Sequence, residues 1–362
     1  MHVPTLILPL AVAGTATAQV PLRPRAELLG PRPPVPSHYV CRRAPETPIV
    51  DGRLDDAAWD AAPWTSRFTD IEGEVRPAPR YLTRARLLWD DAFLYVGAEL
   101  EEPDLWATLT ARDAVIFHDH DFEIFLDPDG DTHAYFELEI NTLGTVWDLF
   151  LSKPYRDGAQ AENGWDISGL RSAVALRGTL NDPSDRDTAW SVELAIPWTA
   201  LAPPGQAGRA PREGDQWRIN FSRVEWDLVV TDGRYVKRTD PATGRPTPEH
   251  NWVWSPQHAI NMHLPELWGV VQFSEEPVGR EVTFREPPDE EVRWALRRIY
   301  YAQSAFFLAH SRYAAAVTEL GVPGAAGVML TLLPQAGGYE ATARDARGTV
   351  WHIREDGRIW RQ

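Results

Sequence analysis

One stretch of the chain, DHDFEIFLDPDGDTHAYFELEIN at residues 119–141, restricts the fold more than any other. Phe122, Ile124 and Leu126 alternate with Asp121, Glu123, Phe125 and Asp127, which is the period-two pattern of a strand with one buried face. The DPDG sequence at residues 127–130 favours a reversal, because Pro presets φ and Gly accepts a positive φ. A second alternating segment follows, so we predict an antiparallel hairpin.

The outer face of this predicted hairpin carries Glu123, Glu137, Glu139 and Asn141, and we expect it to face solvent. Like charges side by side on a sheet destabilise it, so stability alone does not favour this arrangement. Carboxylates and amides orient hydroxyl groups, and a neighbouring aromatic ring covers the apolar face of a sugar. Two interpretations stay open, a ligand surface or the ordinary solvated side of an antiparallel sheet.

Composition excludes some classes of partner. The net charge of -16, with no basic run, argues against nucleic acid and against an anionic membrane surface. The chain has 16 Trp residues, most of them between Trp59 and Trp268. Core packing is the simplest role for each indole, and so many of them favour additional stacking surfaces.

The N-terminus has the features of a secretory signal, with an apolar run followed by Ala16-Thr17-Ala18. We predict a signal peptide at residues 1–18 and a secreted or periplasmic protein. Residues 19–43 are rich in Pro and are expected to form an extended tether. No other segment is long and apolar enough to span a bilayer. Cys41 is the sole cysteine, so no internal disulfide can form.

The remaining chain divides into two parts. Residues 44–275 contain about ten short strands without a βαβ rhythm, which predicts a mainly β fold, an antiparallel, jelly-roll-like β-sandwich. Residues 276–362 predict one long helix over Asp289–Leu320 and a small β-meander that packs on it. The helix is also a candidate contact for a partner protein.

Calcium is the cofactor that the sequence favours. Asp127, Asp129 and Asp131 alternate like the start of a calcium loop, but Leu138 stands where an EF-hand needs its last Glu. An ordinary acidic turn is the competing interpretation. The alternative calcium ligands are Asp119 and Asp121.

From about Ile49 to Phe273 the chain resembles the family-9 carbohydrate-binding modules. The matching pieces are IVDGRLDDAAW at 49–59, LLWDDAFLYVGAEL at 87–100, DFEIFLDPDG at 121–130, WSVELAIPW at 190–198 and WGVVQF at 268–273. The resemblance implies a β-sandwich that binds mono-, di- or oligosaccharides, is often stabilised by calcium, and accompanies modules that degrade glycans.

The resemblance also implies roles for single residues. The polar contacts of the family fall on Glu123 and Glu137, and one of its two sugar-clamping rings falls near Phe117. The second ring position falls near Met262 or His263, neither of which is an indole. We expect a ring from Trp252 or Trp254 instead.

The leading hypothesis is therefore a non-catalytic glycan-binding protein. The predicted contacts are Glu123, Glu137, Asn141, Asn220, Phe117, Trp252 and Trp254. A glycoside hydrolase or lyase is the alternative, because Glu123 and Glu137 could face each other at the ~5 Å of a retaining carboxylate pair. A haem or metal-binding sandwich is a further alternative with Met262 and His263, although neighbours on an extended segment point to opposite sides.

Overall fold

The computed structural model describes residues 35–276, 280–325 and 327–362. The predicted signal peptide and the first part of the predicted tether lie outside these residues. None of the helices in the described ranges is long and apolar enough to cross a lipid bilayer.

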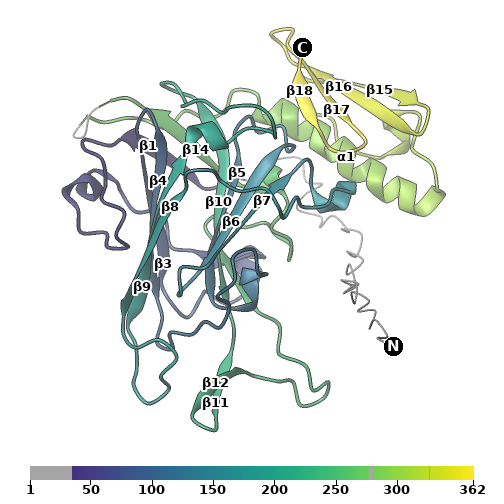
Figure 1. Ribbon diagram of the computed structural model, residues 1–362. Coiled ribbons are helices and arrows are strands. Elements are labelled where there is room, and N and C mark those ends of the chain that lie inside the picture. Colours follow the sequence, from purple (N-terminus) through teal and green to yellow (C-terminus); the bar gives the residue numbers. More distant parts are fainter. Residues whose placement is uncertain (1–34, 277–279, 326) are drawn as a thin grey trace, which may run out of the picture.

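The predicted mainly β sandwich is confirmed (Figure 1). Its strands form one curled sheet in the order β7-β6-β5-β10-β14-β1-β3-β4-β9-β8, with β13 beside β10 and β2 beside β13. These strands are β1 (His38–Arg43), β2 (Thr69–Asp70), β3 (Thr83–Trp89), β4 (Phe93–Glu101), β5 (Asp121–Asp127), β6 (Tyr135–Asn141), β7 (Val146–Leu151), β8 (Arg171–Arg177), β9 (Ala189–Pro197), β10 (Gln216–Glu225), β13 (His250–Val253) and β14 (Gly269–Ser274).

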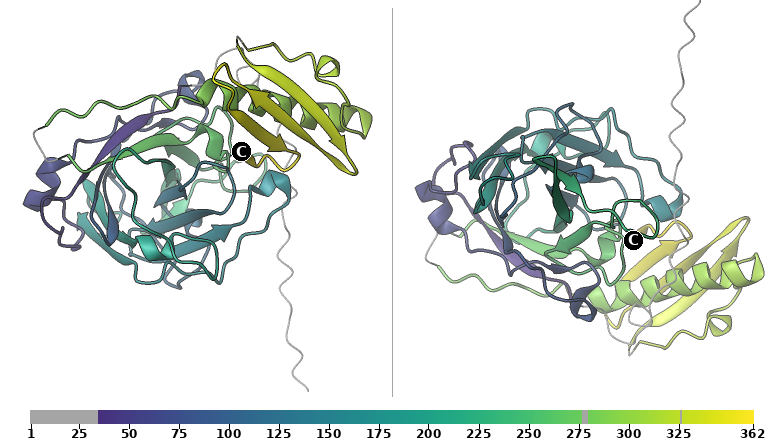
Figure 2. Two further views of the ribbon diagram at one scale, coloured as in Figure 1. Left: turned by 90° about the horizontal axis from the view of Figure 1, so that it is seen from above. Right: turned by 90° about the horizontal axis from the view of Figure 1, so that it is seen from below.

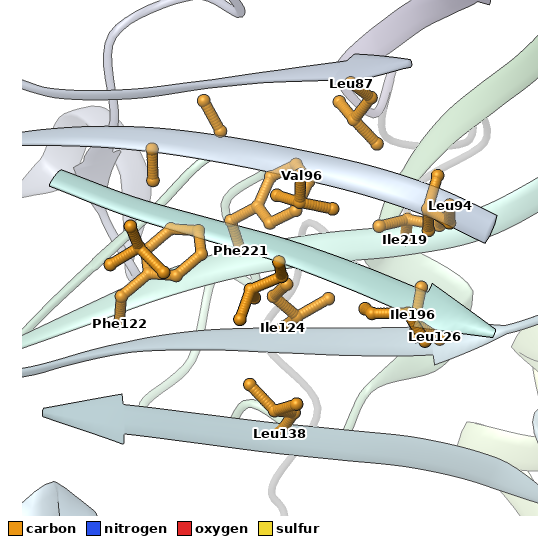
Figure 3. Packing of buried hydrophobic residues seen from close by; sticks show 14 of the residues in the cluster. Leu87, Leu94, Val96, Phe122, Ile124, Leu126, Leu138, Ile196, Ile219 and Phe221 are labelled. Carbon is orange, nitrogen blue, oxygen red and sulfur yellow. The ribbon is translucent and has the colours of Figure 1, made fainter. Parts of the chain in front are cut away.

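The core lies between the two halves of this sheet. Phe122, Ile124 and Leu126 of β5 point into it and meet Val96 of β4 and Ile196 of β9 (Figure 3). All five are at most 1% exposed. The inward set that the alternation predicts is therefore confirmed, and it positions the opposite face of β5 and β6.

The strand β1 corrects the predicted start of the domain. We expected the tether to reach residue 43, yet His38 to Arg42 of β1 pair in parallel with β14, and Arg42 and Arg43 pair in parallel with β3. β1 joins the two halves of the sheet and buries Tyr39 and Cys41. The Pro-rich composition of the preceding residues hid this strand, and the sandwich is antiparallel apart from its two pairings.

The tail forms a separate layer beside the sandwich, as both views of Figure 2 show. It consists of the helix α1 (Glu290–His310) and a four-stranded antiparallel sheet, which confirms the predicted meander. We call α1 and this sheet the tail unit. The sheet strands are β15 (Met329–Gln335), β16 (Gly338–Arg344), β17 (Val350–Arg354) and β18 (Ile359–Arg361).

The helix ends earlier than predicted. α1 stops at His310, where Ser311 adopts a left-handed conformation with φ of 55°. The buried amide of Gln303 then accepts the N–H of Ala314 at 2.8 Å and donates to its carbonyl at 3.1 Å. These two bonds hold the returning chain against the helix, so residues 311–320 lie outside it. A short 3-10 helix, η8 (Val317–Glu319), is all that remains of the predicted second half.

The tail unit is attached to the sandwich by buried charged groups. Arg218 of β10 makes a two-pronged ion pair with Glu290 of α1, at 2.7 and 2.8 Å. The Tyr301 hydroxyl of α1 donates to Glu266, which also pairs with Arg156 at 2.8 Å. The helix that we considered as a contact for a partner protein thus uses much of its surface within the chain.

Candidate functional site

Four carboxylates lie on the face of β5 and β6 that is opposite the core. They are Asp121 and Glu123 of β5 and Glu137 and Glu139 of β6, and we call them the carboxylate cluster. Their common face confirms the predicted alternation. The expected solvent exposure is wrong, since Glu123 and Glu137 are 4% and 5% exposed and the other two 1% or less.

Segments that are distant in the sequence cover this face. A second hydrophobic cluster lies over the outer side of the sheet, with Trp268 packed against Phe125 and Tyr135 at ring distances of 5.5 and 5.3 Å. The Trp268 indole donates to the Met262 carbonyl at 2.8 Å, which fixes the loop before β14. The other members of this cluster are Ile71, Leu149, Leu151 and Val253.

Burial and mutual repulsion raise the proton affinity of the cluster. Burial raises the pKa of Glu123 to about 7, and the nearby Glu249 adds to the increase. Burial, followed by the charge of Glu123, raises the pKa of Asp121, Glu137 and Glu139 well above the usual range. At neutral pH the cluster therefore carries fewer negative charges than it has carboxyl groups.

Aromatic rings flank the cluster. The Phe117 N–H donates to Glu139 Oε2 at 2.8 Å, which ties the short helix η4 (Ile116–His118) to the sheet. The Phe117 ring stacks near that of Trp147, with centroids 6.4 Å apart and planes 30° from parallel. Both rings are half-buried. Phe117 therefore lies beside the carboxylate cluster.

Trp147 was not among the predicted site residues. Glu139 was predicted only as part of the acidic outer face, and Asp121 only as an alternative calcium ligand. Trp147 stands opposite Glu139 in the register of β6 and β7. The alternation of residues 145–151 predicts that the Trp147 side chain lies on one face of a strand. It does not predict the pairing with β6 that brings Trp147 beside Glu139.

The register of the hairpin also changes the predicted carboxylate pair. Glu123 is opposite Glu139, whereas Glu137 is opposite Phe125. Glu123 and Glu137 are thus diagonal neighbours, whose separation in an antiparallel pair is about 7–8 Å between Cα atoms. The predicted direct pair for a retaining glycosidase is therefore wrong.

Asn141 is part of the scaffold beneath the site. Its Nδ2 donates to the Leu109 carbonyl at 2.9 Å and to Asp119 Oδ2 at 3.0 Å. Its Oδ1 accepts the N–H groups of Leu143 and Thr145, both at 3.0 Å. With all these bonds made inside the protein, Asn141 and Asp119 have little capacity left for a sugar or a cation.

Asn220, Trp252 and Trp254 also belong to the scaffold rather than to a binding surface. Asn220 exchanges two hydrogen bonds of 2.9 Å with the backbone of Ser255. Both indoles are at most 3% exposed and lie in the main core, where Trp254 packs against Phe221 at 5.6 Å. The expected sugar-covering role of these indoles is wrong, because β13 pairs with β10 and turns them inward.

Met262 and His263 do not form a cofactor site of their own. Met262 is buried in the second hydrophobic cluster. His263 Nδ1 shares a hydrogen bond of 2.9 Å with the Tyr135 hydroxyl. Burial, and then the charge of Arg156, lowers the pKa of His263 to about 3, so the ring is neutral.

The acidic turn between β5 and β6 fits a calcium ion poorly. Asp127, Asp129 and Asp131 offer oxygens within 4.8 Å of one another. Both oxygens of Asp127, however, accept backbone N–H groups of the turn at 2.9 Å. Arg358 of the tail unit pairs with Asp131 at 2.9 Å, and Arg293 donates to the Gly130 carbonyl. Guanidinium groups of the tail therefore occupy the surroundings that a cation would need.

A second group of charged residues lies inside the sandwich, and no pattern in the sequence predicted it. His120 Nδ1 is 3.1 Å from Glu102 and 3.8 Å from Glu225. The fully buried Arg223 pairs with both glutamates, at 2.6 and 2.8 Å. Burial opposes the charged form of His120, but Glu225 and Glu102 outweigh it and raise its pKa to about 9.

This arrangement predicts a loss of stability at alkaline pH. A folded pKa of about 9, above the ordinary histidine pKa of about 6.5, contributes stability that is complete below pH 6.5 and disappears as pH rises through 9. The wild type should lose about 3 kcal/mol of unfolding free energy across this range that a His120→Gln variant does not lose. Urea unfolding at pH 6, 7.5 and 9 measures the difference, and parallel pH curves for the two proteins would contradict it.

The chain is 26% identical over 208 residues to Exoglucanase XynX of Acetivibrio thermocellus, which covers 57% of this chain and 15% of that protein. It is similar in structure to a putative carbohydrate-binding protein of Bacteroides uniformis, with a TM-score of 0.49 and 15% identity over 66% of this chain and all of the other.

A second solved structure is a family-9 module of Caldicellulosiruptor kristjanssonii in complex with cellotriose. Its TM-score is 0.43 and its identity 18%, over 69% of this chain and all of that chain. Residues 50–245 match the model of the carbohydrate family 9 binding domain-like proteins, which is more than half of the chain. The protein therefore belongs to the carbohydrate family 9 binding domain-like family.

Proposed function

We propose that this protein binds carbohydrate at the carboxylate cluster, with Glu123 and Glu137 accepting hydrogen bonds from sugar hydroxyls. The family match over residues 50–245 is the observation that carries the proposal. Within the cluster, Glu123 and Glu137 retain 4% and 5% exposure, while Asp121 and Glu139 retain 1% or less. The first two are thus the carboxylates nearest to solvent.

The half-buried ring of Phe117 supplies the apolar contact in this proposal. Its N–H is held by Glu139, and its carbonyl accepts the Trp226 indole at 2.9 Å. Two fixed backbone groups orient the ring at low entropic cost, and Trp147 supports it from one side. A sugar ring with an apolar face would stack on such a surface.

We further propose that the protein is exported through residues 1–18 and serves the degradation of extracellular glycans. The similarity to part of Exoglucanase XynX supports this role. The chain spans 15% of that relative's length, so we do not extend the enzymatic activity of the relative to this chain.

A glycan array with the full mature chain tests whether it binds carbohydrate at all. We expect the protein to bind one family of oligosaccharides on the array. A polysaccharide with the same linkage should also bind the protein in a pull-down experiment. A Phe117→Ala variant should lose about tenfold in affinity for that ligand, the usual magnitude for a stacking aromatic. An array without a single reproducible ligand would contradict the proposal.

A further inference from the structure

Three members of the carboxylate cluster converge more closely than sugar recognition requires. Asp121, Glu123 and Glu139 each offer an oxygen, and these oxygens all lie within 4.8 Å of one another. The three side chains come from two paired strands in the sheet, with Glu123 directly opposite Glu139. Strands hold their side chains more rigidly than loops, so this convergence is a fixed property of the fold.

Two oxygens of this trio lack hydrogen-bond partners, whereas Asp121 Oδ1 accepts the Val224 N–H and Glu139 Oε2 accepts the Phe117 N–H. Asp121 Oδ2 and Glu123 Oε2 are buried and accept no hydrogen bond, and the buried hydroxyl of Ser222 opposite Glu123 also has no partner. Among the residues that the structure describes, no Arg or Lys forms an ion pair with any of the three carboxylates. Buried carboxylates without a counter-charge are costly, and each unsatisfied oxygen adds to that cost.

We propose that Asp121, Glu123 and Glu139 bind a divalent cation of the oxygen-preferring class, such as Ca²⁺. The donors are carboxylate oxygens, with the Ser222 hydroxyl adjacent and no thiol in the trio. Such donors suit Ca²⁺, Mg²⁺ or Mn²⁺ rather than the softer transition metals. The cation supplies the positive charge that the surrounding protein does not.

This inference extends the proposed function without depending on it. A cation bound by the converging oxygens of the trio neutralises the negative charge of the cluster. Glu123 and Glu137 then remain available as acceptors for hydroxyl groups. Metal binding is measured here without sugar, so its failure leaves the carbohydrate proposal standing. The reverse also holds, since an inert glycan array leaves the metal site testable.

The test compares the chelator-treated full chain with two variants, Glu139→Gln and Asp121→Asn. CaCl₂ at 100 times its Kd should raise the Tm of the wild type by about 5 °C and give a calorimetric binding signal. Each variant should bind roughly tenfold more weakly or worse. Calorimetry in two buffers should detect protons released on binding, because the ligands must ionise.

The same variants give an opposite result without metal. Glu139→Gln removes one buried like charge, so after chelator treatment its Tm should be equal to or higher than that of the wild type. If Glu139→Gln does not fold, Asp121→Asn replaces it in this comparison. Asp129→Asn in the acidic turn is the matched control, with unchanged Ca²⁺ affinity.

Three outcomes would overturn the inference. One is a wild type that responds to none of CaCl₂, MgCl₂ or MnCl₂ at millimolar concentration. Another is variants that bind as tightly as the wild type. The third is a loss of binding in Asp129→Asn alone, which would assign the ion to the turn. Terbium luminescence sensitised by Trp147, opposite Glu139, should report the same affinity order.

Discussion

An Arg223→Met variant is expected to lose about 3–5 kcal/mol of unfolding free energy, because it leaves two buried glutamates with His120 as their remaining cationic neighbour. Arg223 has no exposed surface and contacts Glu102 at 2.6 Å and Glu225 at 2.8 Å. Its Nη1 also donates to the Glu101 carbonyl at 2.8 Å. Methionine fills much of the same volume but provides neither charge nor donor.

Urea unfolding at neutral pH measures this loss. Arg84→Met is the matched control, since Arg84 pairs with Glu99 at 2.6 Å near the surface and its removal should cost about 1 kcal/mol or less. The loss in Arg223→Met should shrink at acidic pH, where Glu225, with a pKa of about 7, becomes neutral. Equal losses in the two variants would show that the buried group contributes no more than a surface ion pair.

A Trp254→Ala variant should lose about 3–5 kcal/mol, the cost of a large cavity in a well-packed core. The indole is 2% exposed and lies against the backbone of Gly269 so closely that a Cβ there would come within 2.3 Å of the ring. The cavity has little room to collapse, because Phe221 and β14 hold its walls.

Thermal unfolding measures this effect, and Phe117→Ala is the control. Phe117 is half-buried outside the main core, so its loss should cost about 1 kcal/mol and act on sugar binding instead. The opposite pattern, with Trp254→Ala stable but defective in sugar binding, would restore the sequence-based interpretation of Trp254 as a stacking ring.

The hairpin was predictable because its information is local. The alternation over residues 121–140 and the turn at Asp127 specify two strands and their inward faces without reference to the rest of the chain. The long tail helix was predictable for the same reason. Its end was not, since the bonds of Gln303 to Ala314 depend on a tertiary return of the chain.

Exposure of the acidic face could not be predicted, because it depends on distant segments. Trp268 and Val253 cover residues more than 100 positions away in the sequence, and Arg358 reaches Asp131 across 227 positions. Nothing in the local pattern distinguishes a solvated acidic strand from one beneath a loop. The register of Glu123 with Glu139, two positions beyond the predicted partner Glu137, likewise follows from the length of the turn segment.

The central claim is that the carboxylate cluster binds sugar through Glu123 and Glu137. Calorimetric titration of the oligosaccharide found on the array, with the wild type, Glu123→Gln, Glu137→Gln and the control Glu225→Gln, tests it most directly. Loss of a hydrogen bond that leaves a buried polar group without its partner costs about 1–3 kcal/mol, so each of the first two variants should bind roughly 10–100-fold more weakly. Glu225→Gln, which lies on the core side, should bind as the wild type does. Unchanged affinity in both Glu123→Gln and Glu137→Gln would contradict the account.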